Sequence, residues 1–288
     1  MAAPSSSASS QASLSTPLLI DSHVHVWAAD PKHPFAAGAD VPAGVDASVE
    51  RLLELMAANG VPRTVLIQVI HYKWDNSYLA EVLKQYPDKF HGVARVDPLD
   101  PAAPDHLVEL TRQGFRGVRL SPSATADGDW IDGPLMHPLW SRCEQLKVPM
   151  TLLTPTTRLS TIAALIERYP DLTVVIDHMA DAPLDQPDQI KSLLTLARYP
   201  NVFVKISHLW SLSKQAYPFV DSFDLLKSVY DAFGPKRLMW GTDHPVCLPY
   251  TSYARAVALY RDRLDFMPQA DREEIWHGTV QRVWPFGL

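Results

Sequence analysis

The chain has 288 residues, and its 26 Lys and Arg against 32 Asp and Glu give a formal net charge of −6. Hydrophobic residues make up 47% and charged residues 20%, which is typical of soluble globular proteins. No Lys/Arg-rich stretch indicates a nucleic-acid binder, two cysteines cannot form a disulfide scaffold, and no apolar run reaches the roughly 18 residues of a membrane span. The composition therefore predicts a cytoplasmic protein that binds neither nucleic acid nor membrane.

Residues 1–16 are small, polar and uncharged. They carry too little apolar surface to offset the entropy of ordering, so they are predicted to be a disordered tail before one domain at residues 17–288. The Ser-rich composition without acidic residues also resembles a plastid transit peptide, although it contains no arginine. A plastid location is thus the alternative to the cytoplasm.

Eight short apolar runs, rich in Val, Ile and Leu, follow along the chain. They span Leu18–Asp21, Thr64–Val69, Phe90–Val96, Phe115–Leu120, Val148–Thr154, Thr173–Asp177, Val202–Ser207 and Arg237–Trp240. Most lack strict alternation of polar and apolar residues, which favours parallel strands covered on both faces.

Segments of helical period lie between these runs. They span Ser48–Asn59, Asn76–Tyr86, Ala103–Arg112, Pro138–Lys147, Ser160–Tyr169, Pro187–Tyr199, Tyr217–Phe233, Ser252–Leu264 and Ala270–Val280. The first has a candidate N-cap at Asp46 or Ser48 and stops before Gly60. Eight strand-then-helix units predict an α/β protein with a single (β/α)8 TIM-barrel domain. A doubly wound open sheet is the alternative, but the first strand is not followed by the Gly-rich turn that it would favour.

Histidines gather at the predicted C-terminal ends of the strands, where TIM barrels place their chemistry. Six of the 11 histidines fall there, namely His23, His25, His71, His178, His208 and His244. His23 and His25 are two apart on a strand and therefore share a face, so both imidazoles can grip one metal ion or one polarised oxygen. The alternative for this pair alone is two hydrogen-bonded core histidines. His178 and Asp243, on later strands, favour a functional site.

Four segments carry a resemblance to a known family: IDSHVHVW, GVRLS, VVIDHMA and MWGTDHPV. With them the chain resembles the amidohydrolase superfamily of TIM-barrel hydrolases, in its amidohydrolase-2 branch, and is similar to sugar lactonases and 2-pyrone-4,6-dicarboxylate lactonase. The resemblance implies that His23, His25, His178 and Asp243 are the core active-site residues. Binuclear members carry a bridging carboxylated Lys or a Glu on a middle strand. Strand five ends here in Thr154, which cannot bridge two metals, so at most one metal is expected.

The resemblance implies a hydrolase that opens a lactone ring to a hydroxy acid. Asp243 is the predicted general base. His23, His25 and His178 either polarise the carbonyl themselves or, with Asp243, bind one divalent ion, Zn²⁺ or Mn²⁺; both alternatives stay open. A decarboxylase of an aromatic or muconate-type acid is the second reading of the same residues, and a barrel that only binds is the third.

The predicted partner is a small-molecule substrate. Its candidate contacts are Arg119, His71, Tyr72, Trp27, His208 and His244. Lys205 could join Arg119 in a cationic rim, whereas Arg119 could instead pair with Asp97 or Asp177. Residues 207–214 contain no arginine, which favours a less charged lactone over a dicarboxylate.

The late aromatic residues Trp276, Trp284 and Phe286 either form an apolar patch or pack on the barrel, so the chain is expected to be a monomer or a homodimer. No thiolate-activating motif surrounds either cysteine. Cys143 and Cys247 are therefore predicted to be free thiols.

Overall fold

The computed structural model describes residues 17–122 and 130–287, so the predicted tail at residues 1–16 lies outside the described residues. The strands are β1 (Ile20–Val24), β2 (Arg63–Ile67), β3 (Phe90–Arg95), β4 (Phe115–Leu120), β5 (Met150–Leu152), β6 (Val174–Ile176), β7 (Val202–Lys205) and β8 (Leu238–Met239). The α-helices are α1 (Val49–Asn59), α2 (Ser77–Gln85), α3 (Ala103–Arg112), α4 (Met136–Leu146), α5 (Leu159–Arg168), α6 (Pro187–Thr195), α7 (Leu209–Leu212), α8 (Phe223–Phe233), α9 (Tyr253–Asp262), α10 (Gln269–Glu273) and α11 (Thr279–Val283).

Short helical turns complete the list: η1 (Ile70–Tyr72), η2 (Thr156–Arg158), η3 (Asp177–Asp181), η4 (Leu196–Arg198), η5 (Val220–Ser222), η6 (Pro235–Arg237) and the π-helical η7 (Glu274–Gly278). In the described part of the chain, no helix has both the length and the apolar character needed to cross a membrane.

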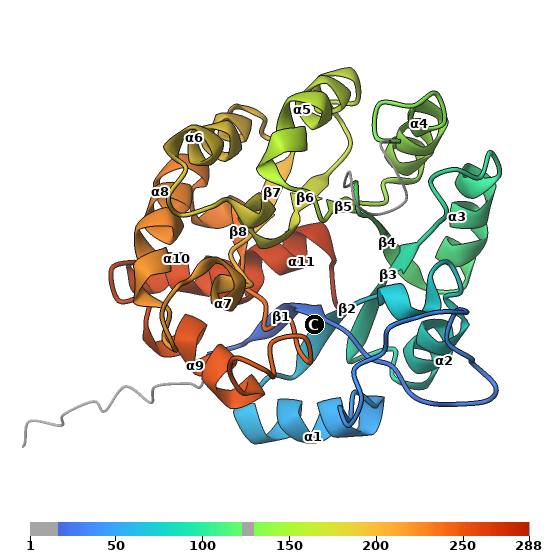
Figure 1. The fold of residues 1–288 in the computed structure, drawn as a ribbon, viewed down its shortest axis with the longest axis horizontal. Helices are drawn as coiled ribbons and strands as arrows, with labels where there is room; N and C mark the ends of the chain where they lie inside the picture. The colour runs from blue at the N-terminus through green and yellow to red at the C-terminus, as the bar shows by residue number, and fades with distance from the viewer. Residues whose placement is uncertain (1–16, 123–129, 288) are drawn as a thin grey trace, which may run out of the picture.

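The eight strands form one parallel sheet in chain order, β1 to β8, surrounded by the helices (Figure 1). The segment after β8 returns to β1 through a parallel bridge between Val24 and His244. Two backbone hydrogen bonds strengthen this seam: the His25 N–H donates to the His244 carbonyl at 2.7 Å, and the Asp243 N–H donates to the His23 carbonyl at 2.9 Å. The predicted single-domain TIM barrel is confirmed.

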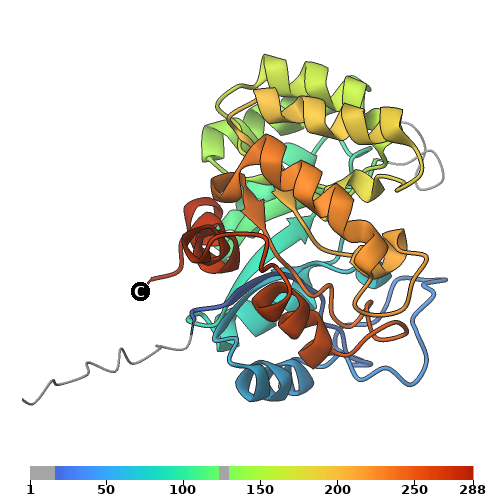
Figure 2. The same ribbon diagram turned by 90° about the vertical axis from the view of Figure 1, so that its left-hand side faces the viewer.

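The C-terminal segment covers the barrel at the end where the strands begin (Figure 2). Trp284 is fully buried and packs with inward-facing strand residues such as Ile20, Val93 and Met239. At the same end, Phe286 stacks on His91 at the start of β3, with ring centroids 4.0 Å apart. The late aromatic residues therefore pack on the barrel, and Trp276, Trp284 and Phe286 do not form an exposed patch.

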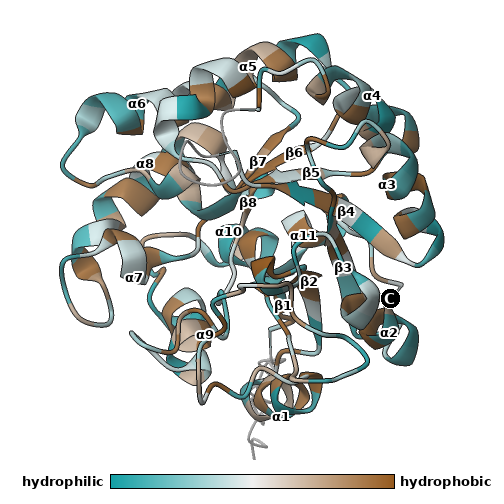
Figure 3. Ribbon diagram, turned by 45° about the vertical axis from the view of Figure 1, so that its right-hand side comes forward, coloured by the Kyte–Doolittle hydropathy of each residue, from teal (hydrophilic) through white to brown (hydrophobic). Residues whose placement is uncertain are grey.

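A second hydrophobic layer lies between the sheet and the surrounding helices, whose outer faces are hydrophilic (Figure 3). α1 shows why these helices form where they do. The Ser48 side chain accepts a hydrogen bond from the Arg51 N–H at the helix start, and Gly60 ends the helix with a left-handed φ of 69°. Of the two N-caps predicted for this helix, Ser48 is the one observed.

The structure differs from the sequence predictions mainly at element ends. β1 begins and ends later than predicted, so His23 lies within the strand. The predicted helix Tyr217–Phe233 begins only at Phe223, because Phe219 takes a left-handed φ of 62° that a continuous helix cannot contain. The predicted last helix, Ala270–Val280, is divided by the π-helical turn η7.

Both cysteines are free and fully buried. Burial raises the pKa of each thiol well above its ordinary value, which lowers the thiolate fraction that reacts with a disulfide reagent. We therefore expect dithionitrobenzoate to titrate no thiol in the native protein and two thiols after unfolding in guanidinium. Rapid release of one equivalent from the native protein would show that Cys143 or Cys247 is accessible.

Candidate active site

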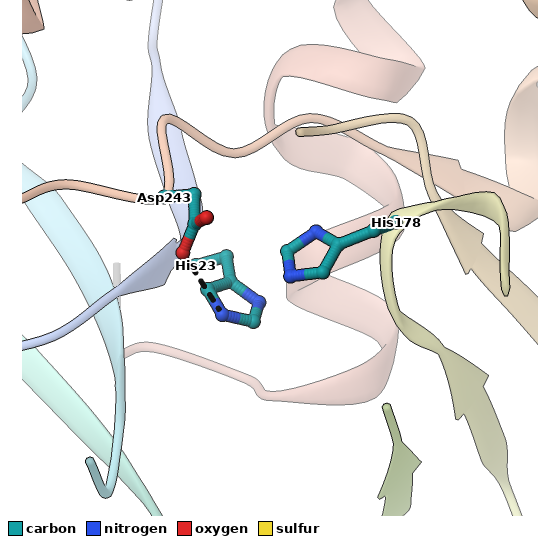
Figure 4. A group of neighbouring side chains, drawn as sticks. All are labelled: His23, His178 and Asp243. Atoms are coloured by element: carbon teal, nitrogen blue, oxygen red, sulfur yellow. Dashed lines mark ion pairs between the residues drawn. The ribbon is translucent and has the colours of Figure 1, made fainter. Parts of the chain in front are cut away.

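Four side chains from the ends of three different strands meet above the barrel interior. His23 lies on β1 and His25 just after it, whereas His178 lies in the turn η3 after β6 and Asp243 in the loop after β8. Figure 4 shows His23, His178 and Asp243. The Nε2 atoms of His23 and His25 are 3.3 Å apart, and they lie 3.6 and 3.5 Å from Asp243 Oδ1. The His178 ring centroid is 4.5 Å from that of His23. All four residues are at most 5% exposed.

Three residues around the site, His178, His208 and Asp243, have unusual backbone conformations that orient their side chains. His178 and Asp243 have φ values of 52° and 55°, in the left-handed region that non-glycine residues rarely adopt. His208, at the start of α7, has a φ of 68°. Such strain persists only where surrounding contacts enforce it, and it gathers at functional sites. For Asp243 the constraint is its backbone hydrogen bond to His23, which fixes the carboxylate against β1.

Hydrogen bonds to the backbone and to Ser207 set the proton positions on two imidazoles. His25 Nδ1 donates to the Ile67 carbonyl at 2.7 Å, so neutral His25 directs the lone pair of Nε2 into the site. His178 Nδ1 lies 2.8 Å from Ser207 Oγ. When the Ser207 hydroxyl donates to this nitrogen, Nε2 of neutral His178 carries the proton. Burial lowers the pKa of His178 well below its ordinary value, so this ring is neutral at neutral pH.

A buried ion cluster lies beneath the imidazoles. Asp177 accepts a hydrogen bond from Arg119 Nε at 3.0 Å, and its other oxygen lies 3.1 Å from Lys205 Nζ and 3.3 Å from His23 Nδ1. Burial alone would raise the pKa of Asp177, but the charges of Lys205 and Arg119 and the contact with His23 outweigh it and hold this pKa well below its usual range. Asp177 is therefore ionised beneath His23, with Arg119 and Lys205 as its cationic partners.

The contacts of this cluster define the roles of Lys205 and Arg119, which the sequence had placed in a cationic rim. Lys205 is fully buried and lies 5.3 Å above the Trp284 ring, so it does not contribute to a rim. Arg119 pairs with Asp177, as the sequence allowed, and it also lines the pocket. Sequence reasoning named Asp177 only as a possible partner of Arg119, although it stands beside His178 in the VVIDHMA segment.

Asp21 is a second buried carboxylate that the sequence did not single out. It accepts hydrogen bonds from the Thr242 N–H at 3.0 Å, the Thr242 hydroxyl at 2.6 Å and the His23 N–H at 3.1 Å. These bonds tie β1 to the segment after β8. Asp21 shares a strand face with His23, so the alternation of β1 is the signal that could have revealed it.

A cavity of about 450 Å³ opens above these groups. Seven predicted residues line it: His25, Trp27, His71, Arg119, His178, His208 and Asp243. His23 is fully buried below them, with no exposed surface.

Two predicted substrate contacts do not line this cavity. The Tyr72 hydroxyl donates to the Ala28 carbonyl at 3.0 Å and accepts from the Ala28 N–H at 3.1 Å, so it fastens the loop after β1. The His244 ring packs perpendicular to that of Tyr253, with centroids 5.3 Å apart. The side chains of Tyr72 and His244 are both buried in the protein.

The donor set fits one metal ion. His23, His178 and Asp243 are buried and offer ligand atoms within 4.8 Å of one another. The atoms His23 Nε2, His25 Nε2 and Asp243 Oδ1 form a triangle with edges of 3.3, 3.5 and 3.6 Å. Tetrahedral bonds of about 2.0–2.2 Å to nitrogen and carboxylate oxygen place ligands about 3.3–3.6 Å apart. The side chains are therefore spaced as ligands of a single ion would be.

Comparisons with known proteins identify the family and the fold. A family model described as Amidohydrolase matches residues 20–286. The L-fucono-1,5-lactonase of Burkholderia ambifaria is 32% identical over 79% of this chain and 80% of its own. The 4-sulfomuconolactone hydrolase of Hydrogenophaga intermedia is 27% identical over 78% of this chain and 74% of its own. An amidohydrolase from Burkholderia multivorans, solved with bound zinc, has the same fold, with a TM-score of 0.80 at 24% identity over 94% of this chain and all of its own.

Proposed function

The chain belongs to the amidohydrolase family, and from this premise we propose that it hydrolyses a lactone to the corresponding hydroxy acid. The observation that carries the proposal is the meeting of Asp243 with His23, His25 and His178 at the floor of a ligand-sized cavity. The two curated relatives described above are named for the hydrolysis of lactones, which supports this reaction.

Asp243 is the proposed general base. Burial raises the pKa of Asp243, but the neighbouring imidazoles of His25, His178 and His23 outweigh that effect, so its pKa lies below the ordinary value. Asp243 is therefore ionised at neutral pH and can accept a proton from water as the water attacks the carbonyl carbon. We propose that Asp243 then passes this proton to the ring oxygen as the ester bond breaks.

His25 and Asp243 would position the attacking water together. The Nε2 lone pair of His25 and Asp243 Oδ1 are both acceptors, and they lie 3.5 Å apart. One water molecule can donate a hydrogen to each, which points its oxygen away from both and toward the cavity. In the metal-free site, the Nε2–H of neutral His178 would donate to the carbonyl oxygen as it gains negative charge. With an ion bound, His178 would instead carry its proton on Nδ1, donated to Ser207, and offer the Nε2 lone pair.

His23, His25, His178 and Asp243 would hold a single Zn²⁺ or Mn²⁺. Such an ion, when bound, would supply Lewis-acid polarisation of the carbonyl. The hydrogen-bond partners of His23 suit both the metal-bound and the metal-free site. With an ion bound, His23 Nδ1–H would donate to Asp177, which leaves the Nε2 lone pair for the ion. Without an ion, Lys205 Nζ, 3.1 Å away, can donate to Nδ1, and Nε2–H then points at His25 or Asp243. Arg119, His71, Trp27 and His208 are the proposed substrate contacts.

A pH-indicator screen of lactones tests the function, because ring opening releases one proton at neutral pH. We expect hydrolysis without release of carbon dioxide, whereas carbon dioxide from aromatic or muconate-type acids would identify a decarboxylase instead. Metal analysis of the purified protein distinguishes the two forms of the site. If the ion is required, we expect about one equivalent of metal, loss of activity on chelation, and recovery on adding Zn²⁺ or Mn²⁺. Unchanged turnover of fully chelated protein would assign carbonyl polarisation to the side chains alone.

A further inference from the structure

The wall of the cavity above the reactive floor is apolar. Besides the histidines, Arg119 and Asp243 near the floor, the described lining consists of Trp27, Pro42, Val45, Val69, Ile70, Leu153, Trp210, Pro245, Val246, Pro249 and Tyr250. Trp210 and Tyr250 stack in parallel, with ring centroids 4.4 Å apart and planes 13° from parallel. This pair forms a flat aromatic surface that joins α7 to the loop after β8.

Several polar atoms of the floor are engaged by other protein groups. His25 Nδ1 is used by the Ile67 carbonyl, His178 Nδ1 by Ser207, and Arg119 Nε by Asp177. His208 Nδ1 lies 3.3 Å from Asp181 Oδ1. The polar atoms that remain, including the two terminal nitrogens of Arg119, lie near the floor. Along the wall, the described residues offer only the ring nitrogens of Trp27 and Trp210 and the hydroxyl of Tyr250, so a polyhydroxylated substrate would find few hydrogen-bond partners there.

The apolar wall continues to an apolar rim at the surface. Ile70 is 56% exposed, Val246 39% and Tyr250 55%, and all three also line the cavity. Large apolar side chains that remain exposed beside a cavity indicate a surface that a ligand covers. Their continuity with the floor means that one molecule can reach from the reactive groups to the rim.

We propose that the site selects a lactone that carries an apolar substituent, an alkyl chain or an aryl group, in preference to a polyhydroxylated lactone. The inference rests on the proposed lactonase function. The ester group lies on the floor at Asp243 and His178, and the substituent extends along the wall past Ile70 and Val246. A sugar lactone in this position would bring hydroxyl groups against apolar side chains, and each hydroxyl left without a hydrogen-bond partner weakens binding.

The test is a series of δ-lactones with increasing 5-alkyl chains, measured beside glucono-δ-lactone and L-fucono-1,5-lactone. Burial of one methylene contributes enough free energy for about a fourfold rise in kcat/KM, so we expect about that rise per methylene until the chain passes the rim. Hydrolysis of the sugar lactones at rates equal to or above those of the alkyl lactones would overturn the proposal and leave the lactonase function standing.

Variants of wall residues test whether the dependence on chain length arises at the wall of the cavity. Ile70→Gln and Val246→Thr place polar atoms beside the proposed chain, and we expect each to lower kcat/KM for the longest lactone about tenfold and to flatten the dependence on chain length. Leu248→Gln is the matched control, because Leu248 is 38% exposed on the same loop as Val246 but does not line the cavity. Equal effects of Ile70→Gln and Leu248→Gln would contradict the assignment.

Calorimetric binding of 5-alkyl δ-lactams, whose amide resists hydrolysis, separates the two proposals. Affinity that rises with chain length in the parent and not in Ile70→Gln supports the apolar site, even if no lactone is opened and the proposed function fails. Affinity independent of chain length overturns the inference whatever the protein hydrolyses.

Discussion

Asp243→Asn is expected to lower kcat for lactone opening by about 100-fold or more, because the amide cannot accept the proton of the attacking water. Asparagine suits the position better than alanine for two reasons. It keeps the size of the side chain, and it tolerates the left-handed backbone that Asp243 adopts at φ 55°. The measurement is steady-state kinetics on the best lactone of the screen, with circular dichroism to confirm that the fold is retained.

Asp185→Asn is the matched control for this change. The Asp185 side chain is 63% exposed and pairs with Lys214 on the surface, away from the lining of the cavity. We expect its kinetics to equal those of the parent. If Asp243→Asn hydrolyses the lactone as fast as the parent, another group is the base.

Asp177→Ala is expected to destabilise the protein by about 3–5 kcal/mol, the range found when one partner of a buried ion pair is removed. The substitution leaves Arg119 and Lys205 buried, at 4% and 0% exposure, without the carboxylate that holds both. Urea unfolding of parent and variant measures the difference in the free energy of unfolding.

Glu167→Ala provides the comparison at the surface. Glu167 pairs with Arg198, and both side chains are more than half exposed. Exposed pairs contribute about 0–1 kcal/mol, so we expect a change within that range. A loss at Asp177 no larger than the loss at Glu167 would mean that the buried cluster contributes little to stability.

The sequence predicted the barrel because its strands are covered on both faces and therefore mostly lack strict alternation of polar and apolar residues. The predicted strand Phe115–Leu120 matches β4 at both ends. It also predicted which side chains approach one another, because all strands of a parallel barrel end at the same face. The helical periodicity of the sequence does not show where the backbone leaves the helical conformation. The left-handed Phe219 and the π-helical turn at Glu274–Gly278 therefore interrupt helices that were predicted as continuous.

The sequence also could not predict the direction in which side chains point within the loops. His71 and Tyr72 are neighbours in the turn η1, yet His71 lines the cavity while Tyr72 binds the backbone of Ala28. The period of a strand does not apply to such a turn, so the sequence could not separate the two. The pairing of Asp177 with Arg119 and Lys205 depends on contacts across the barrel interior, which no local pattern reports.

The loop after β8 carries Asp243 together with Val246 and Tyr250, and a backbone hydrogen bond of 3.0 Å from the Cys247 N–H to the Asp243 carbonyl couples its two parts. Redesign of this loop for another substrate would therefore also change the orientation of the Asp243 carboxylate. Ile70 belongs to a different loop, after β2, and no hydrogen bond between this loop and that of Asp243 is found among the described residues. Libraries that vary residue 70 should thus change substrate range at a smaller cost in turnover than libraries at residues 246 and 250.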